Sequence, residues 1–111
     1  APAGRRAELA AVADVVTAGA EAVDLAAALD LLASRGLRRI LCEGGPHLFG
    51  QLLAAEAVDE LCLTLSPLLA GPGPRRIVGG QPSPTAPHPL RLLHVLEEDG
   101  ALLLRYAVDR S

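Results

Sequence analysis

A strand-to-helix turn, Glu43-Gly44-Gly45-Pro46, constrains the fold of this chain more than any other feature of its sequence. The apolar residues 40–42 before the turn are typical of a buried strand, and the apolar spacing after it is that of an amphipathic helix. Pro46 suits the first helical position because the helix does not need its missing N–H there. Glycines let backbone N–H groups approach an anion closely, and the first turn of a helix favours negative ligands. The turn therefore predicts a phosphate cradle, with a simple tight connection as the alternative.

Strand and helix patterns alternate on both sides of this turn. We expect strands at residues 11–17, 38–42 and 60–66, with helices between Asp24 and Gly36 and over residues 46–55. Asp24 is a good helix N-cap, and Gly36 is a good residue to close the same helix. Because right-handed β-α-β crossovers make neighbouring strands parallel, this order predicts a parallel sheet that binds ligands at the carboxyl ends of its strands. The turn at residues 43–45 lies at such an end.

The carboxyl-terminal part of the chain differs in composition. Six of the nine prolines lie between residues 69 and 89, and a loop of this length inside a compact domain is usually functional or mobile. Residues 90–95 and 101–108 flank the acidic segment 97–100, which ends in Asp-Gly. Because Asp-Gly favours the turn that matches the twist of the flanking strands, an antiparallel hairpin is expected here.

Length and charge limit the class of protein. At 111 residues the chain forms at most one domain. Its net charge is −3 and its ten basic residues, all Arg, are scattered, which argues against nucleic-acid binding. No apolar run has the length of a membrane span and the amino terminus lacks signal-peptide organisation, so a cytoplasmic protein without membrane partners is expected. Because the sequence contains no Met, we expect a processed product, a trimmed chain or a fragment of a longer one.

Cysteine and histidine spacing does not indicate a metal site. Cys42 and Cys62 fall on predicted strands and are expected to be buried, reduced thiols, with a disulfide or a metal-binding pair as the disfavoured alternative. His47, His88 and His94 are so widely spaced that no zinc-binding pattern can be assembled from them. No metal is therefore expected.

One stretch, LRRILCEGGPHLFGQLLAAEAVDELCLTLSPLLAG at residues 37–71, closely resembles the reductase domain of riboflavin biosynthesis, the pyrimidine reductase often fused behind a deaminase. The matching elements are the Glu-Gly-Gly turn at 43–45, Leu48, Val-Asp-Glu-Leu at 58–61 and Pro-x-x-x-Gly at 67–71. A weaker likeness covers most of the chain. The resemblance implies an α/β, dihydrofolate-reductase-like three-layer fold, with a mostly parallel sheet and a C-terminal antiparallel hairpin.

The same resemblance implies that residues 1–111 are the carboxyl-terminal portion of a single reductase domain. Domains of this family begin with a strand that carries an Asp-Gly element for substrate and cofactor, and no such strand is found ahead of the matching residues here. The amino-terminal part of the domain is therefore expected to be missing from this chain.

The resemblance implies that Gly44 and Gly45 pass under NADPH, and in many relatives an unusual cis peptide bond joins this glycine pair. It also implies that the N–H groups of His47 and Leu48 face the pyrophosphate and the nicotinamide ribose of NADPH. His47 replaces a small hydroxylated residue common in relatives, so it either touches a phosphate or faces solvent. Glu43 either binds the ribose hydroxyls of the substrate or caps the following helix. The sequence identifies no catalytic proton donor.

Charged residues elsewhere have less specific interpretations. Asp59 and Glu60 begin a strand and are expected to be structural, meeting backbone N–H groups or an Arg. Arg75 and Arg76 either bind a 2′-phosphate or a substrate phosphate, or form a solvated or salt-bridged pair in the Pro-rich loop.

The leading functional hypothesis is an NADPH-dependent reductase that resembles 5-amino-6-(5-phosphoribosylamino)uracil reductase. It would reduce a ribosyl group to ribityl, with a phosphorylated pyrimidine as substrate, in a homodimer. The alternatives are a non-catalytic dimerisation or nucleotide-binding remnant of the same fold, and a dihydrofolate-reductase-like reductase of another substrate. A Rossmann dehydrogenase is disfavoured because no Gly-x-Gly-x-x-Gly follows the first predicted strand.

Overall fold

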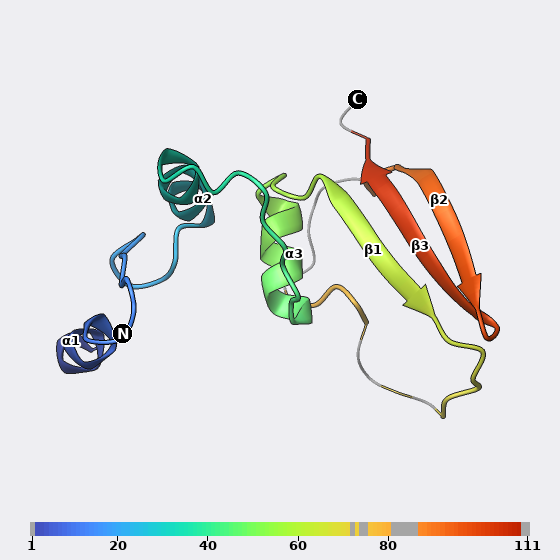
Figure 1. Ribbon diagram of the computed structural model, residues 1–111, viewed down its shortest axis with the longest axis horizontal. Helices are drawn as coiled ribbons and strands as arrows, with labels where there is room; N and C mark the ends of the chain where they lie inside the picture. Colours follow the sequence, from blue (N-terminus) through green and yellow to red (C-terminus); the bar gives the residue numbers. More distant parts are fainter. Residues whose placement is uncertain (1, 72, 74–75, 81–86, 110–111) are drawn as a thin grey trace. The chain divides into compact units, whose positions relative to one another are not determined.

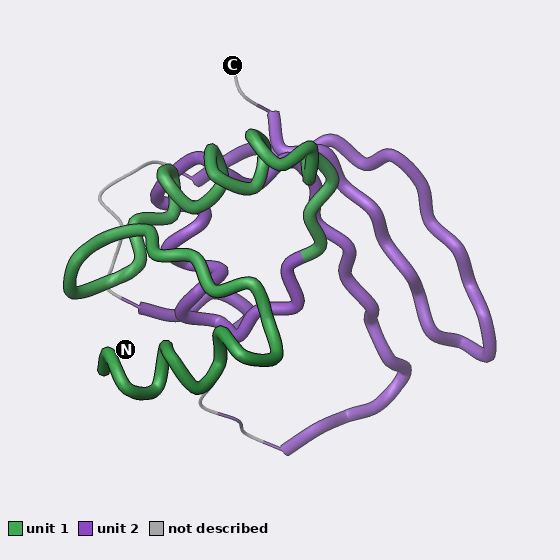
Figure 2. The backbone as a smooth tube through the Cα atoms, turned by 60° about the vertical axis from the view of Figure 1, so that its left-hand side comes forward, with its two compact units in different colours: residues 1–41 green, residues 42–111 purple. Residues whose placement is uncertain are grey.

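The computed structural model describes residues 2–71, 73, 76–80 and 87–109 (Figure 1). In chain order these residues form α1 (Ala3–Ala10), α2 (Leu25–Ser34), α3 (Pro46–Ala54), β1 (Glu60–Leu65), β2 (Leu90–Glu98) and β3 (Ala101–Val108). The chain divides into two compact units, residues 1–41 and residues 42–111 (Figure 2).

The first unit holds α1 and α2. The Asp24 carboxylate accepts a hydrogen bond from the Ala27 N–H at 3.0 Å and so caps the start of α2. At the other end Gly36 has a φ of +82°, and the Leu37 N–H donates to the Leu32 carbonyl at 3.0 Å. This is the Schellman arrangement that glycine favours, so both predicted ends of α2 are confirmed. The helix α1 was not predicted.

The strands predicted at residues 11–17 and 38–42 are wrong. Neither stretch is a strand in the structure, and both are exposed to solvent. A strand exists only in a hydrogen-bonded ladder, and parallel strands are stable only where both of their faces are covered. Among the described residues neither stretch has a partner strand, so strand-like composition alone does not make it one.

The sheet belongs to the second unit and has the order β1-β3-β2. Both pairs are antiparallel, so the mostly parallel sheet expected from the sequence is not formed by the described residues. The third predicted strand and the hairpin are confirmed as β1 and as β2 with β3. At the hairpin turn Asp99 and Gly100 have φ angles of 50° and 79°, as the two central residues of a type I′ turn require.

Strand register separates the two faces of the sheet. One face is apolar, because Leu61 and Leu92 both pair with Tyr106, and Leu63 and Val95 both pair with Leu104. The opposite face is mainly polar and carries Glu60, Cys62, Thr64, Arg91, His94 and Arg105, beside Leu96, Leu103 and Ala107.

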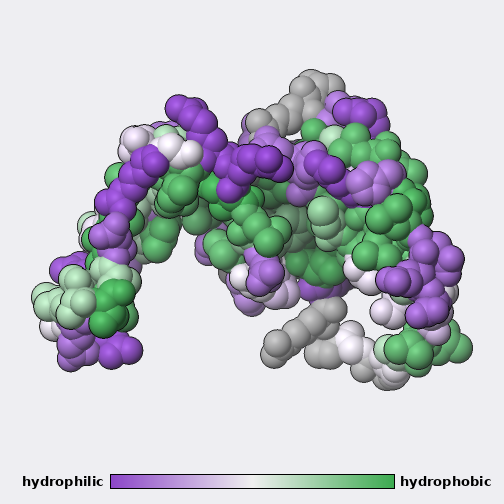
Figure 3. Space-filling model, in the orientation of Figure 1, coloured by the Kyte–Doolittle hydropathy of each residue, from purple (hydrophilic) through white to green (hydrophobic). Residues whose placement is uncertain are grey.

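The apolar face of the sheet is only partly covered. Leu92 is 50% exposed and Val95 is 43% exposed, and no described residue of the chain is fully buried. Figure 3 shows apolar side chains at the surface over the strands. Because a soluble monomer seldom exposes a large apolar area, this face has the character of an interaction surface.

Candidate functional site

The turn that leads into α3 has the backbone geometry expected of a glycine pair. Gly44 has a φ of +83°, a region that residues with a side chain seldom adopt, and the peptide bond from Gly44 to Gly45 is cis. Gly45 is the N-cap of α3 and Pro46 is its first residue. The Phe49 N–H donates to the Gly45 carbonyl at 3.0 Å, which makes the first hydrogen bond of the helix.

The surface of this turn is open and rich in hydrogen-bond donors. No side chain caps α3, and the N–H groups of His47 and Leu48 have no acceptor among the described residues. A Cβ atom placed on Gly44 or Gly45 would have no heavy atom within 4 Å. Unpaired N–H groups under open space at a helix start fit an anionic ligand such as a phosphate.

Glu43 lies at the start of the turn and is exposed. The capping alternative is wrong, because no side chain accepts a hydrogen bond from the first turn of α3. Its carboxylate forms no hydrogen bond or ion pair with a described residue, so both oxygens are free to accept hydrogen bonds from a ligand. Substrate binding by Glu43 stays a prediction.

A second segment, residues 76–80, lies against the first turns of α3. The Gly79 N–H donates to the Pro46 carbonyl at 3.0 Å. A Cβ atom on Gly50 would collide with the Gly79 carbonyl oxygen, and a Cβ atom on Gly80 would lie 3.9 Å from the His47 Nδ1. Glycines at positions 50 and 79 are therefore what allows the two backbones to meet.

The contact between the 76–80 segment and α3 was not predicted from the sequence. The signals for it were a glycine inside the predicted helix at position 50 and the glycine pair at 79–80, since a glycine in a helix interior often marks a close approach of another backbone.

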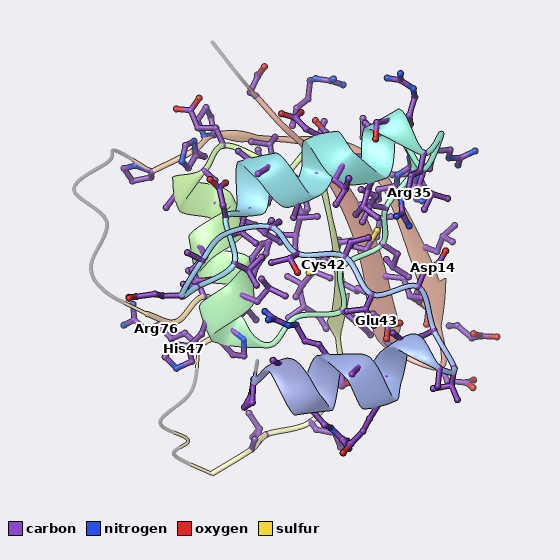
Figure 4. The ribbon with its side chains drawn as sticks, turned by 90° about the vertical axis from the view of Figure 1, so that its left-hand side faces the viewer. Asp14, Arg35, Cys42, Glu43, His47 and Arg76 are labelled. Atoms are coloured by element: carbon purple, nitrogen blue, oxygen red, sulfur yellow. The ribbon has the colours of Figure 1, made fainter. Side chains whose placement is uncertain are left out.

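Two basic side chains lie at this end of α3. Figure 4 shows His47 and Arg76 near the amino-terminal end of the helix, on the first turn and on the 76–80 segment respectively. Arg76 makes no hydrogen bond or ion pair with any described residue, and Arg75 lies outside the described residues. Arg76 therefore begins the segment whose Gly79 binds the first turn of α3, and phosphate binding by Arg76 stays a prediction.

The structural role predicted for Glu60 is confirmed. Its carboxylate accepts hydrogen bonds from the Arg105 Nε at 2.9 Å and from the Arg105 Nη2 at 2.6 and 2.8 Å. Since Cys62 pairs with Arg105, Glu60 is the diagonal neighbour of Arg105 on the same face of the sheet. The neighbouring Asp59 carbonyl accepts a hydrogen bond from the Val108 N–H at 2.9 Å.

The cysteines are free thiols, as expected, but both are exposed, so their predicted burial is wrong. Cys62 is exposed because it lies on the polar face of the sheet. Cys42 is exposed because the strand predicted around it is not formed. No group of three or more His, Cys, Asp or Glu residues that could hold a metal ion occurs in the described part of the chain.

The sequence as a whole matches a known family. Residues 2–104 match the family described as the RibD C-terminal domain. The chain belongs to this family. This finding confirms the family predicted from the Glu-Gly-Gly turn and its neighbouring motifs.

Two archaeal relatives of this RibD-type chain carry the same name, 2,5-diamino-6-ribosylamino-4(3H)-pyrimidinone 5′-phosphate reductase. The protein from Archaeoglobus fulgidus is 36% identical over 78 residues, which are 70% of this chain and 32% of that protein. The protein from Methanothermobacter thermautotrophicus is 39% identical over 71 residues, which are 64% of this chain and 33% of that protein. The chain thus matches about a third of the length of these curated relatives.

Solved structures confirm the fold class. A pyrimidine reductase-like protein from Corynebacterium diphtheriae superposes with a TM-score of 0.78 at 28% identity, over 93% of this chain and 42% of that one. RibD from Acinetobacter baumannii gives 0.72 at 23% identity, over 94% of this chain and 29% of that one. The chain therefore has the α/β fold of this reductase family. None of the helices in the described residues is long and apolar enough to cross a membrane.

Proposed function

We propose that this chain carries the cofactor-binding turn of a pyrimidine reductase that uses NADPH to reduce a ribosyl group to ribityl. The observation behind this proposal is the open glycine turn, where the N–H groups of His47 and Leu48 lack acceptors in the described structure. Membership of the RibD C-terminal domain family and the shared name of both archaeal relatives support it. The substrate is a ribosylaminopyrimidine 5′-phosphate, either the diaminopyrimidinone of those names or the aminouracil predicted from the sequence.

Each residue of the turn has a separate role in this proposal. Gly44 and Gly45 let the backbone approach the pyrophosphate of NADPH, because neither has a side chain in the open space above the turn. The N–H groups of His47 and Leu48 donate hydrogen bonds to the same anion, and the partial positive charge of the start of α3 adds to the attraction. When bound, the cofactor supplies the hydride. Glu43 accepts hydrogen bonds from the ribose hydroxyls of the substrate and orients the sugar.

The proposal extends to the assembly and the location of the protein. Residues 1–111 act as the carboxyl-terminal portion of one reductase domain, which works as a homodimer in the cytoplasm without nucleic-acid or membrane partners. The net charge of −3 and the scattered arginines agree with the absence of a nucleic-acid site. The half-exposed apolar face of the sheet agrees with a further polypeptide surface that covers it.

A chimera provides the functional test. In it, this chain replaces the segment that it matches in the Archaeoglobus fulgidus reductase, so that the rest of a reductase domain is present. We expect the chimera to oxidise NADPH only when the pyrimidine substrate is added. NADPH binding without turnover would favour the alternative of a non-catalytic nucleotide-binding module, and turnover with a folate instead would favour another substrate. A folded chimera that binds no NADPH would contradict the proposed function.

A further inference from the structure

We infer that Gly50 and Gly79 are positioning residues, which hold the first turn of α3 in the conformation that binds the cofactor. The inference rests on the proposed function, because it concerns the same turn. In this role the two glycines act through the backbone of the helix start, without a contact of their own to NADPH. They let the 76–80 segment pack directly on α3, so that the first turn is fixed from outside the helix.

The start of α3 has little of its own to fix it. No side chain caps the helix, and Gly44 and Gly45 lead into it, although glycine has the widest range of backbone conformations of any residue. The helix has nine residues, and a helix of that length is marginal in isolation. Because helix ends fray, the N–H groups of His47 and Leu48 need support from elsewhere to keep one orientation.

The 76–80 segment supplies that support. The Gly79 N–H donates to the Pro46 carbonyl at 3.0 Å, and among the described residues this is the one backbone hydrogen bond that joins the first turn of α3 to a distant part of the chain. A Cβ atom on Gly79 would lie 3.1 Å from the Pro46 Cβ and 3.6 Å from the His47 nitrogen. The segment therefore lies directly against the peptide group that carries one of the two N–H donors of the proposed site.

Gly50 is the second point of contact, one helical turn after Pro46. A Cβ atom on Gly50 would collide with the Gly79 carbonyl oxygen and would lie 3.6 Å from the Val78 Cγ1. Alanine favours a helix more than glycine does, so glycine at this interior position weakens α3 itself. The 76–80 segment can pack here only because position 50 has no side chain. The helix is thus intrinsically weaker at the position where the segment needs the space.

Gly50→Ala tests the inference, because the added methyl group displaces the 76–80 segment from α3 while it favours the helix itself. Gly4→Ala is the matched control, since Gly4 also lies in a helix, α1, and its Cβ would have no heavy atom within 4 Å. Gly79→Ala is a milder second variant, because its Cβ would be tight against Pro46 without colliding with it. All three variants are made in the Archaeoglobus chimera. Calorimetry gives the Kd for NADPH, and scanning calorimetry gives the Tm.

We expect Gly50→Ala to weaken NADPH binding by about fivefold, since the loss of one hydrogen bond leaves the turn in its binding conformation for a smaller fraction of the time. Gly79→Ala should have a smaller effect of the same kind, and Gly4→Ala should have none. In hydrogen–deuterium exchange without NADPH, the amides of Gly79 and Phe49 should exchange faster in Gly50→Ala. The first donates to Pro46 and the second closes the first turn of α3.

An unchanged Kd in Gly50→Ala would overturn the inference whether or not the Tm falls, because a merely structural role lowers stability without changing the affinity of the folded protein. Weaker binding without faster exchange at Gly79 would also overturn it, since the methyl group would then act on the cofactor directly. If Gly50→Ala does not fold, the same two criteria apply to Gly79→Ala. Failure of the proposed function is visible separately, because the wild-type chimera would then bind no NADPH, while the exchange at Phe49 would still report whether the segment holds the turn.

Discussion

Gly45→Ala separates cofactor binding from folding, because the structure gives the added methyl group no neighbour. The φ of Gly45 is −75° and its ψ is −167°, which any residue adopts without strain, and its Cβ would have no heavy atom within 4 Å. Alanine is a poorer N-cap than glycine by about 0.5–1 kcal/mol, while the stiffer unfolded chain offsets this by about 0.4–1 kcal/mol. The free energy of unfolding should therefore change by less than about 1 kcal/mol, or a few degrees in Tm.

The same methyl group should weaken NADPH binding by at least about tenfold. It occupies the open space from which the phosphate approaches the N–H groups of His47 and Leu48, and the loss of one charged hydrogen bond is sufficient for that factor. Calorimetry on the chimera gives the Kd, and scanning calorimetry gives the Tm. Gly71→Ala is the matched control, because its Cβ also has no neighbour within 4 Å and Gly71 lies outside the turn. An unchanged Kd for NADPH in Gly45→Ala would refute the role of the glycine turn.

Three further predictions test other parts of the structure. Glu43→Gln in the chimera should lower kcat/KM for the pyrimidine and leave the Kd for NADPH and the Tm nearly unchanged, because Glu43 does not cap α3; normal turnover would remove Glu43 from the substrate site. Glu60→Gln should lower the free energy of unfolding by about 0.5–1 kcal/mol in a denaturant titration, because exposed ion pairs contribute little and the Glu60 and Arg105 side chains are 41% and 44% exposed. A decrease above about 3 kcal/mol would indicate a buried pair instead. The 111-residue chain alone should self-associate in light scattering and should not oxidise NADPH with the pyrimidine, because its apolar sheet face is partly exposed and no described strand pairs with the outer edges of β1 and β2. A monodisperse, cooperatively melting and active monomer would contradict this.

Elements that depend on a few neighbouring residues could be predicted from the sequence. The Asp24 cap, the Gly36 helix end, Pro46 at the first position of α3 and the Asp99-Gly100 turn each depend on contacts within five residues, and all four are present. The family was also predicted from short motifs, because those motifs lie within one contiguous stretch of sequence, residues 37–71.

Features that depend on distant residues could not be predicted in this way. Residues 11–17 and 38–42 have strand composition, but whether they form strands depends on partners that composition does not reveal. The contact between Gly50 and Gly79 joins residues far apart in the sequence, so it was not predictable from local patterns. The role of Glu60 was predicted correctly, yet Arg105 as its partner followed only from the strand register.

The central claim is that the glycine turn and the start of α3 hold the cofactor. Hydrogen–deuterium exchange of the chimera, measured with and without NADPH, tests this claim most directly. Amide hydrogens exchange slowly when they donate hydrogen bonds, and those of His47 and Leu48 have no acceptor among the described residues. We predict that NADPH slows exchange in the peptide covering residues 43–49 and leaves the peptide covering the hairpin turn at Asp99 and Gly100 unchanged. NADPH binding that protects other peptides but leaves residues 43–49 exchanging as in the free protein would contradict the assignment.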